Sequence, residues 1–256
     1  MASVLFPPGN GTPRSALSPV TTISSSPTSS SSVNPPLALP PDPRSSRLSL
    51  WPGLWTRSSA PGRRFDVVGT SYGGFVAYHM ARSCGPEKVR KVVIASSDLL
   101  KKEADDLALA ERGGVNHVSE LMIPKGPAEV RRFASLVVYK PPKFMPDFVV
   151  RDVLMKLFNV NVAQKMELMR SLTLPDETKF QLTPLPQEAM LIWGQQDRIF
   201  PLEKAVQIKQ ILGEDVKLAT IKNTGHLPQT EDPRRFNEIL LDFLLSSPRQ
   251  WKMEHH

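Results

Sequence analysis

The sequence predicts an α/β fold with a mostly parallel sheet and an inserted helical segment. Short strands rich in Val, Ile and Leu alternate with runs of helical periodicity. Between residues 98 and about 184 the apolar pattern is helical only. Residues 1–61 show neither pattern. We therefore expect one folded domain, residues 62–256, which carries its helical insertion as a lid over one end of the sheet.

The first predicted unit of the domain is strand, helix, strand. Arg64–Gly69 is a short β-rich run, and Phe75–Cys84 has apolar residues at helical spacing. Gly85 and Pro86 end that helix. Val89–Ala95 then has the continuous apolar character of a strand buried on both faces of a parallel sheet.

The remaining elements follow from the same patterns. Helices are expected in the insertion at 127–138, 147–159 and 162–172, separated by prolines and an Asn-rich junction. The sheet resumes with Ala189–Gly194. A helix over 202–212, a strand over 216–221 and a terminal helix to Leu245 then follow. Asp232 and Pro233 are suited to the start of that last helix.

Residues 1–61 have the composition of a disordered tail. Residues 1–60 contain 15 Ser and 11 Pro but only one acidic residue, Asp42. Such a stretch buries too little apolar surface to offset the entropy lost on ordering. A Ser-rich, acid-poor N-terminus is also typical of a transit peptide, so a chloroplast destination is one expectation. A plain low-complexity tail or an aberrant exon is the alternative.

Charge and cysteine content exclude several classes of function. The chain carries 32 Lys and Arg against 25 Asp and Glu, a net charge of +7, but its basic residues are scattered without interleaved aromatics. We therefore expect no nucleic-acid partner. No apolar run reaches the roughly 18 residues of a membrane span, so an intracellular, cytoplasmic protein is expected. Cys84 is the single cysteine, which excludes an intramolecular disulfide.

Gly69-Thr70-Ser71-Tyr72-Gly73 matches the G-x-S-x-G nucleophile elbow. In such an elbow the glycines permit a strained turn that exposes the serine hydroxyl above the sheet, and the predicted strand and helix around Ser71 provide that setting. The first helical amide, from Tyr72, is then a candidate oxyanion donor.

A serine hydroxyl needs a base, and the base needs an orienting carboxylate. His226 follows the predicted strand 216–221, and Asp197 follows Ala189–Gly194. The chain order Ser, Asp, His is the one expected after a G-x-S-x-G elbow. Ser71, Asp197 and His226 are therefore predicted to meet at the carboxyl ends of the strands.

Other candidates are weaker. Asp98, after the Val89–Ala95 strand, is a rival for the role of the acid. His79 is expected to be structural. His117 lies in the insertion, where a surface role is expected and contact with substrate is the alternative. His255 and His256 lack metal-ligand spacing, and no metal or organic cofactor is expected.

Three blocks give the chain a clear resemblance to the α/β-hydrolase superfamily: VVGTSYGGFVAYHMA, LIWGQQDRIFP and NTGHLPQTEDPRRFNEILLDFL. The three blocks are similar to the corresponding sequences of plant hydrolases that resemble monoacylglycerol lipases, and to those of meta-cleavage-product (C–C bond) hydrolases. The resemblance covers roughly Arg63 to Leu245. It implies an inserted lid and a Ser-His-Asp triad, and Ser71 at the elbow favours ester or C–C bond hydrolysis.

The chain departs from that family ahead of the elbow. The resemblance implies several earlier strands and a His-Gly loop that supplies a second oxyanion donor, but no His precedes His79. We therefore expect an N-terminally truncated version of the fold.

The resulting expectation is a serine hydrolase for a small hydrophobic ester, acylglycerol-like, or a related carbonyl compound. Its apolar part would contact lid residues, and the candidates are Phe144, Phe148, Met155 and Phe158. The alternatives are a hydrolase-fold ligand receptor and a catalytically impaired truncated paralogue. The sequence identifies no protein partner.

Overall fold

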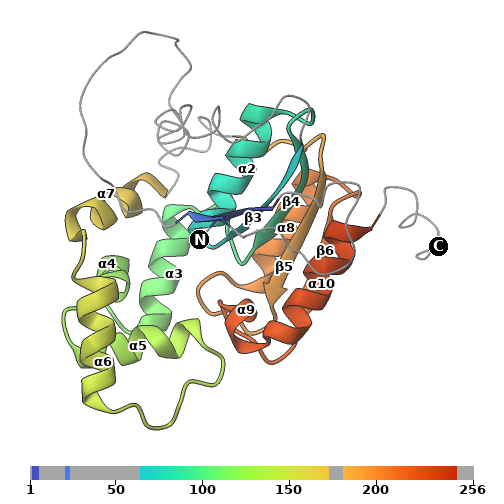
Figure 1. Ribbon diagram of the computed structural model, residues 1–256. Helices are drawn as coiled ribbons and strands as arrows, with labels where there is room; N and C mark the ends of the chain where they lie inside the picture. Colours follow the sequence, from blue (N-terminus) through green and yellow to red (C-terminus); the bar gives the residue numbers. More distant parts are fainter. Residues whose placement is uncertain (1, 6–20, 24–63, 173–180, 247–256) are drawn as a thin grey trace.

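The computed structural model describes residues 2–5, 21–23, 64–172 and 181–246 (Figure 1). The rest of 1–61, including the possible transit peptide, lies outside the described residues, as do His255 and His256. Within the described part, no helix is both long and apolar enough to cross a membrane.

The sheet has the strand order β2-β1-β3-β4-β5-β6. Its parallel part consists of β3 (Phe65–Thr70), β4 (Val89–Ala95), β5 (Glu188–Gly194) and β6 (Lys217–Ile221). Helix α2 (Tyr72–Cys84) connects β3 to β4, and α8 (Leu202–Leu212) connects β5 to β6. The α/β fold class and its mostly parallel sheet are therefore confirmed.

Two short strands lie where the sequence patterns predicted a disordered tail. β1 (Ala2–Leu5) pairs antiparallel with β3, and β2 (Thr21–Ile23) pairs antiparallel with β1. The expectation that no strand precedes Arg64 was thus wrong for these residues. Their segments are too short for a recognisable period, and their pairing with β3 is a long-range contact that composition does not reveal.

Each face of the parallel strands buries its own apolar cluster. Val67, Ile94 and Trp193 point to one face, where they pack with residues of α2 and α8. Val68, Val93 and Ile192 point to the other face, against α10 (Pro233–Leu245). This alternation is the period-2 geometry of a strand. Because helices cover both faces of the sheet, apolar residues are needed on both faces, and the strands are continuously apolar.

The insertion between β4 and β5 is helical, and its helices gather at one end of the sheet (Figure 1). Its elements are α3 (Glu103–Gly113), α4 (Val118–Met122), α5 (Pro127–Val137), α6 (Asp147–Val153), the π-helical turn η2 (Leu154–Phe158) and α7 (Val162–Leu172). The last four were predicted. Helices α3 and α4 were not, because α3 is rich in charged residues and Ala and α4 is very short.

Candidate active site

Ser71 lies at the sharp turn between β3 and α2, with φ 53° and ψ −123°. This backbone conformation is costly for a residue with a Cβ and is typical of functional turns. Gly69 is required there, because a Cβ on it would lie 2.0 Å from the carbonyl oxygen of Gly73. A Cβ on Gly74 would lie 2.4 Å from that of Ser97. The local sequence therefore permits the turn that raises the Ser71 hydroxyl at the end of β3.

Asp197 lies in the loop after β5, and its side chain is buried. Its Oδ1 accepts hydrogen bonds from the amides of Ile199 and Phe200, both at 2.9 Å. Its Oδ2 lies 2.9 Å from Nδ1 of His226. The carboxylate is thus held by its own loop with one oxygen directed at the imidazole.

His226 lies in the loop after β6 and contacts both other predicted residues. Its Nε2 is 3.0 Å from Oγ of Ser71, and its Nδ1 contacts Asp197. Its ring also packs edge-on against Phe200. The structure therefore brings Ser71, His226 and Asp197 into one hydrogen-bonded chain at the carboxyl ends of β3, β5 and β6.

The loop that carries Asp197 (the acid loop) and the loop that carries His226 (the His226 loop) are joined by hydrogen bonds. The amide of Gln196 donates to the carbonyl of Thr224 at 2.9 Å, and the amide of Thr224 donates to Oε1 of Gln196 at 3.1 Å. A Cβ on Gly194 would lie 2.0 Å from the carbonyl oxygen of Gly225. These contacts fix the separation of Asp197 and His226, and no sequence motif had drawn attention to them.

Tyr72, the candidate oxyanion donor, is the first residue of α2 and directly follows Ser71. The amide of Gly74 donates to the carbonyl of Ser71 at 2.9 Å, which begins the helix. The positive end of the α2 dipole consequently lies at the serine.

Asp98, the rival acid, has different contacts. Its Oδ1 accepts from the amide of Leu100 at 2.9 Å, and its Oδ2 lies 3.2 Å from Nζ of Lys204. That lysine also contacts Asp105 at 2.6 Å. Burial raises the pKa of Asp98, and Lys204 opposes the shift. Both oxygens of Asp98 therefore face partners other than His226.

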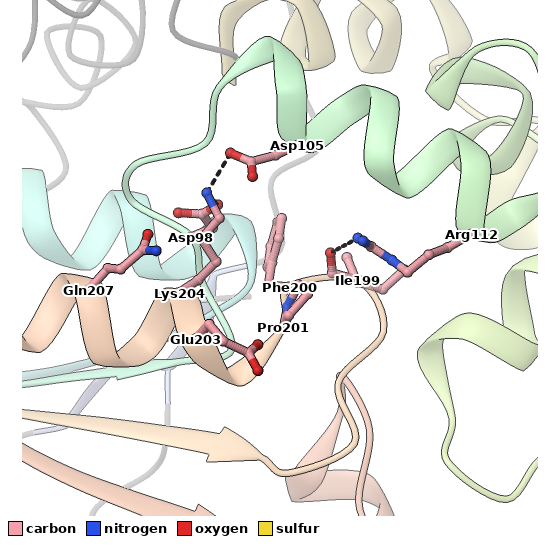
Figure 2. Close-up of a pocket in the computed structure, with 9 residues that line it drawn as sticks. All are labelled: Asp98, Asp105, Arg112, Ile199, Phe200, Pro201, Glu203, Lys204 and Gln207. Carbon is pink, nitrogen blue, oxygen red and sulfur yellow. Dashed lines mark hydrogen bonds and ion pairs between the residues drawn. The ribbon is translucent and has the colours of Figure 1, made fainter.

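Asp98 lies beside a cavity of about 200 Å³ behind the acid loop (Figure 2). Lys204 and Asp105 line it, and so does Phe200, whose ring also packs against His226. Arg112 of α3 reaches the same loop, where its Nε donates to the carbonyl of Arg198 at 3.0 Å and an Nη donates to that of Ile199 at 3.4 Å. The insertion thus holds the acid loop directly.

The remaining titratable candidates have structural positions. His79 is buried on α2 with its ring edge-on to Tyr78. His117 caps α4, since its Nδ1 accepts from the amide of Ser119 at 3.1 Å. Cys84 is half-buried, and burial raises its pKa. Among the described residues, no group of three or more His, Cys, Asp or Glu side chains is arranged to hold a metal ion.

The four lid residues expected to contact substrate differ in how exposed their side chains are. Phe144, Phe148 and Met155 are 80%, 74% and 61% exposed. Phe158 instead packs edge-on against Phe133, with ring centroids 5.6 Å apart, inside the lid's own apolar cluster. The side chains that contact Ser71 and His226 in the hydrogen bonds and ring contact described above are those of Asp197, Phe200 and each other, not these four.

The sheet order, the elbow after β3 and the helical insertion between β4 and β5 define an α/β-hydrolase architecture. The chain belongs to the alpha/beta hydrolase family, whose family model matches residues 8–239. The match begins inside the Ser- and Pro-rich stretch, well before residue 62.

Individual proteins share less with the chain. An uncharacterized hydrolase of Bacillus subtilis, YugF, is 38% identical over 64 residues, which are 25% of this chain and 23% of YugF. A 2-hydroxy-6-oxononadienedioate/2-hydroxy-6-oxononatrienedioate hydrolase of Pseudomonas is 24% identical over 184 residues, 71% of this chain. The chain spans 63% of the length of that hydrolase. The resemblance to C–C bond hydrolases noted from the sequence is thereby confirmed.

Among solved structures, a bacterial membrane phospholipase A superposes with a TM-score of 0.54. The two sequences are 22% identical, and the superposition covers 72% of this chain and 57% of the phospholipase. At this identity the superposition establishes a shared fold.

Proposed function

We propose that the chain is a serine hydrolase that acts on a carboxylic ester, acylglycerol-like, or on a related carbonyl compound, through an acyl-enzyme on Ser71. The observation that carries this proposal is the hydrogen-bonded chain Ser71–His226–Asp197, with distances of 3.0 and 2.9 Å. Both distances are hydrogen bonds: one lets the base take the proton of the nucleophile, and the other lets the carboxylate orient the base.

In the proposed reaction, Nε2 of His226 takes the proton of Ser71 as Oγ attacks the substrate carbonyl carbon. Asp197 stabilises the imidazolium that forms. The amide of Tyr72, at the positive end of α2, is the proposed donor to the oxyanion. Collapse of the tetrahedral intermediate breaks the bond to the leaving alcohol, which receives the proton from His226. Water, deprotonated by the same imidazole, then releases the acid and restores Ser71.

The exposed lid side chains are proposed to contact the apolar part of the substrate. Phe144, Phe148 and Met155 expose apolar surface that a hydrophobic acyl group would cover. Phe158 is proposed to act indirectly, because its ring is occupied in packing against Phe133.

A fluorophosphonate probe tests the central proposal. Wild-type protein is expected to be labelled rapidly at Ser71, and Ser71→Ala is expected to remain unlabelled. Folded wild-type protein that resists the probe would refute the hydrolase proposal. Slow labelling with a single turnover would instead favour a ligand receptor.

Hydrolysis of a C–C bond is the second candidate, favoured by the Pseudomonas relative that aligns with 71% of the chain. A 2-hydroxy-6-oxo-dienoate and a series of p-nitrophenyl esters of increasing chain length would separate the two. We expect higher kcat/KM for the esters.

A further inference from the structure

Glu231 joins the His226 loop to the lid. It is the last residue of the short helix α9 (Pro228–Glu231). Its Oε1 accepts a hydrogen bond from the amide of Gly225 at 2.6 Å, and its Oε2 accepts one from the amide of Tyr139 at 2.8 Å. Each carboxylate oxygen thus binds a different segment: Gly225 directly precedes His226, and Tyr139 lies just after the end of α5.

A third hydrogen bond runs directly between these two segments. The amide of His226 donates to the carbonyl of Val137, the last residue of α5, at 2.8 Å. The approach is close enough to require glycine at position 225. A Cβ there would lie 2.6 Å from the carbonyl oxygen of Val137 and 3.0 Å from the amide nitrogen of Tyr139. The lid and the histidine loop are therefore in backbone contact.

The backbone around Glu231 is itself well fixed. The amides of Thr230 and Glu231 donate to the carbonyl of Leu227 at 2.8 and 3.1 Å, and the amide of Asp232 donates to that of Pro228 at 2.9 Å. Pro228 begins the helix with its restricted φ. The carboxylate is thus presented from a rigid turn that starts immediately after His226.

We propose that Glu231 is a positioning residue that holds the backbone of His226 against residues 137–139 and so couples the placement of the lid to the alignment of the base. The inference rests on the proposed function of His226. A carboxylate suits this role because both oxygens accept, and hydrogen bonds to a charged acceptor are stronger than neutral ones. An amide side chain would direct an NH₂ group at one of the two backbone donors.

Glu231→Gln is the test variant, and Glu238→Gln is its matched control. Glu238 lies on α10, contacts Arg234 and Arg235, and has a side chain 44% exposed. In Glu231→Gln we expect kcat for a p-nitrophenyl ester to fall about 10- to 100-fold, the effect of a small misplacement of a catalytic group, with KM nearly unchanged. Fluorophosphonate labelling should slow by the same factor. Glu238→Gln should match the wild type in both measurements.

Amide hydrogen exchange provides a readout independent of catalysis. Loss of the carboxylate should speed exchange at Gly225 and Tyr139 in Glu231→Gln, while amides of β4 keep their wild-type rates. Wild-type kcat and labelling in Glu231→Gln would overturn the proposal, and so would an equal loss in Glu238→Gln. If Glu231→Gln does not fold, Glu231→Asp replaces it, and a wild-type kcat in that variant also overturns the proposal.

The two proposals fail in different ways. A wild-type protein without Ser71-dependent labelling would refute the hydrolase. The exchange experiment would still test the contact, because it needs no activity, and unchanged exchange at Gly225 and Tyr139 would refute the role of Glu231.

Discussion

The ring of Phe200 lies edge-on against the imidazole of His226, with ring centroids 5.3 Å apart and ring planes at 74°. Its backbone amide holds Asp197, and its carbonyl accepts from Nε1 of Trp193 at 2.8 Å. Phe200 thus contacts the proposed base with its ring and the proposed acid with its backbone. Phe200 also lines the cavity, together with Asp98 and Lys204.

Truncation of Phe200 is expected to loosen His226. Phe200→Leu keeps the backbone hydrogen bonds but removes the ring that packs against the imidazole. We expect Ser71 labelling to slow about 10-fold or more, because a base that moves by a fraction of an ångström aligns poorly. Phe236→Leu is the control, since Phe236 is also buried but lies against the other face of the sheet. Both variants should lose roughly 1–2 kcal/mol of stability by loss of packing. Equal labelling rates in the two variants would contradict this role for Phe200.

The choice between Asp197 and Asp98 as the acid can be tested with isosteric variants. In Asp197→Asn the amide NH₂ would face Nδ1 of His226, which would place the proton on Nε2 and block acceptance from Ser71. We expect kcat to fall by about 10⁴-fold. Asp98→Asn should leave kcat within about threefold of the wild type, because Asp98 contacts Leu100 and Lys204 instead. The reverse pattern would transfer the role to Asp98.

Asp98 should also shape the pH dependence of stability. Burial raises its pKa above the ordinary value of 3.8. The folded state therefore binds this proton more tightly than the unfolded state does. The stability contributed by protonated Asp98 is complete below pH 3.8 and is lost as the pH rises through the raised pKa. Asp98→Asn removes this dependence. As the pH rises from 3.8 through the raised pKa, the free energy of unfolding of the variant should therefore increase relative to that of the wild type. Urea unfolding of both proteins between pH 3.5 and 7 measures the two free energies, and a difference between them that does not change with pH would refute the expectation.

Local patterns were sufficient for the parts of the molecule that depend on nearby residues. Ser71, Asp197 and His226 each follow a strand with a clear apolar run, and carboxyl ends of parallel strands share one sheet edge. The helices α5, α6 and α7 have an apolar period, with prolines between α5 and α6 and an Asn-rich junction before α7. These features depend on residues that lie close together in the sequence, which is why their positions could be predicted from it.

Long-range contacts between unremarkable groups could not be predicted. Glu231 acts on two backbone amides, which have no residue-specific signal in the sequence. Arg112 likewise contacts backbone carbonyls across the fold. The exposed lid aromatics were expected to line a substrate site, but the apolar period of α6 and η2 is used to bury Val150 and Leu154. Periodicity identifies the buried face of such a helix and leaves the use of the opposite face to experiment.

The exposed face of the lid leads to the last prediction. Phe148 and Met155 lie on α6 and η2 with most of their surface in solvent, so truncating them should change stability by no more than about 0.5 kcal/mol. If they cover the apolar part of a substrate, Phe148→Ala and Met155→Ala should raise KM for long-chain p-nitrophenyl esters. The acetate ester should be affected little. Each lost contact is worth about 1–3 kcal/mol, or roughly 5- to 150-fold in kcat/KM.

Val206→Ala is the matched control for the lid variants, because Val206 is also exposed, at 43%, but lies on α8 outside the lid. Its kinetic constants should equal those of the wild type for every ester. A chain-length profile that is the same in Phe148→Ala, Met155→Ala and Val206→Ala would exclude the exposed lid face from substrate binding. The acyl group would then have to be accommodated by residues nearer to the Ser71 elbow.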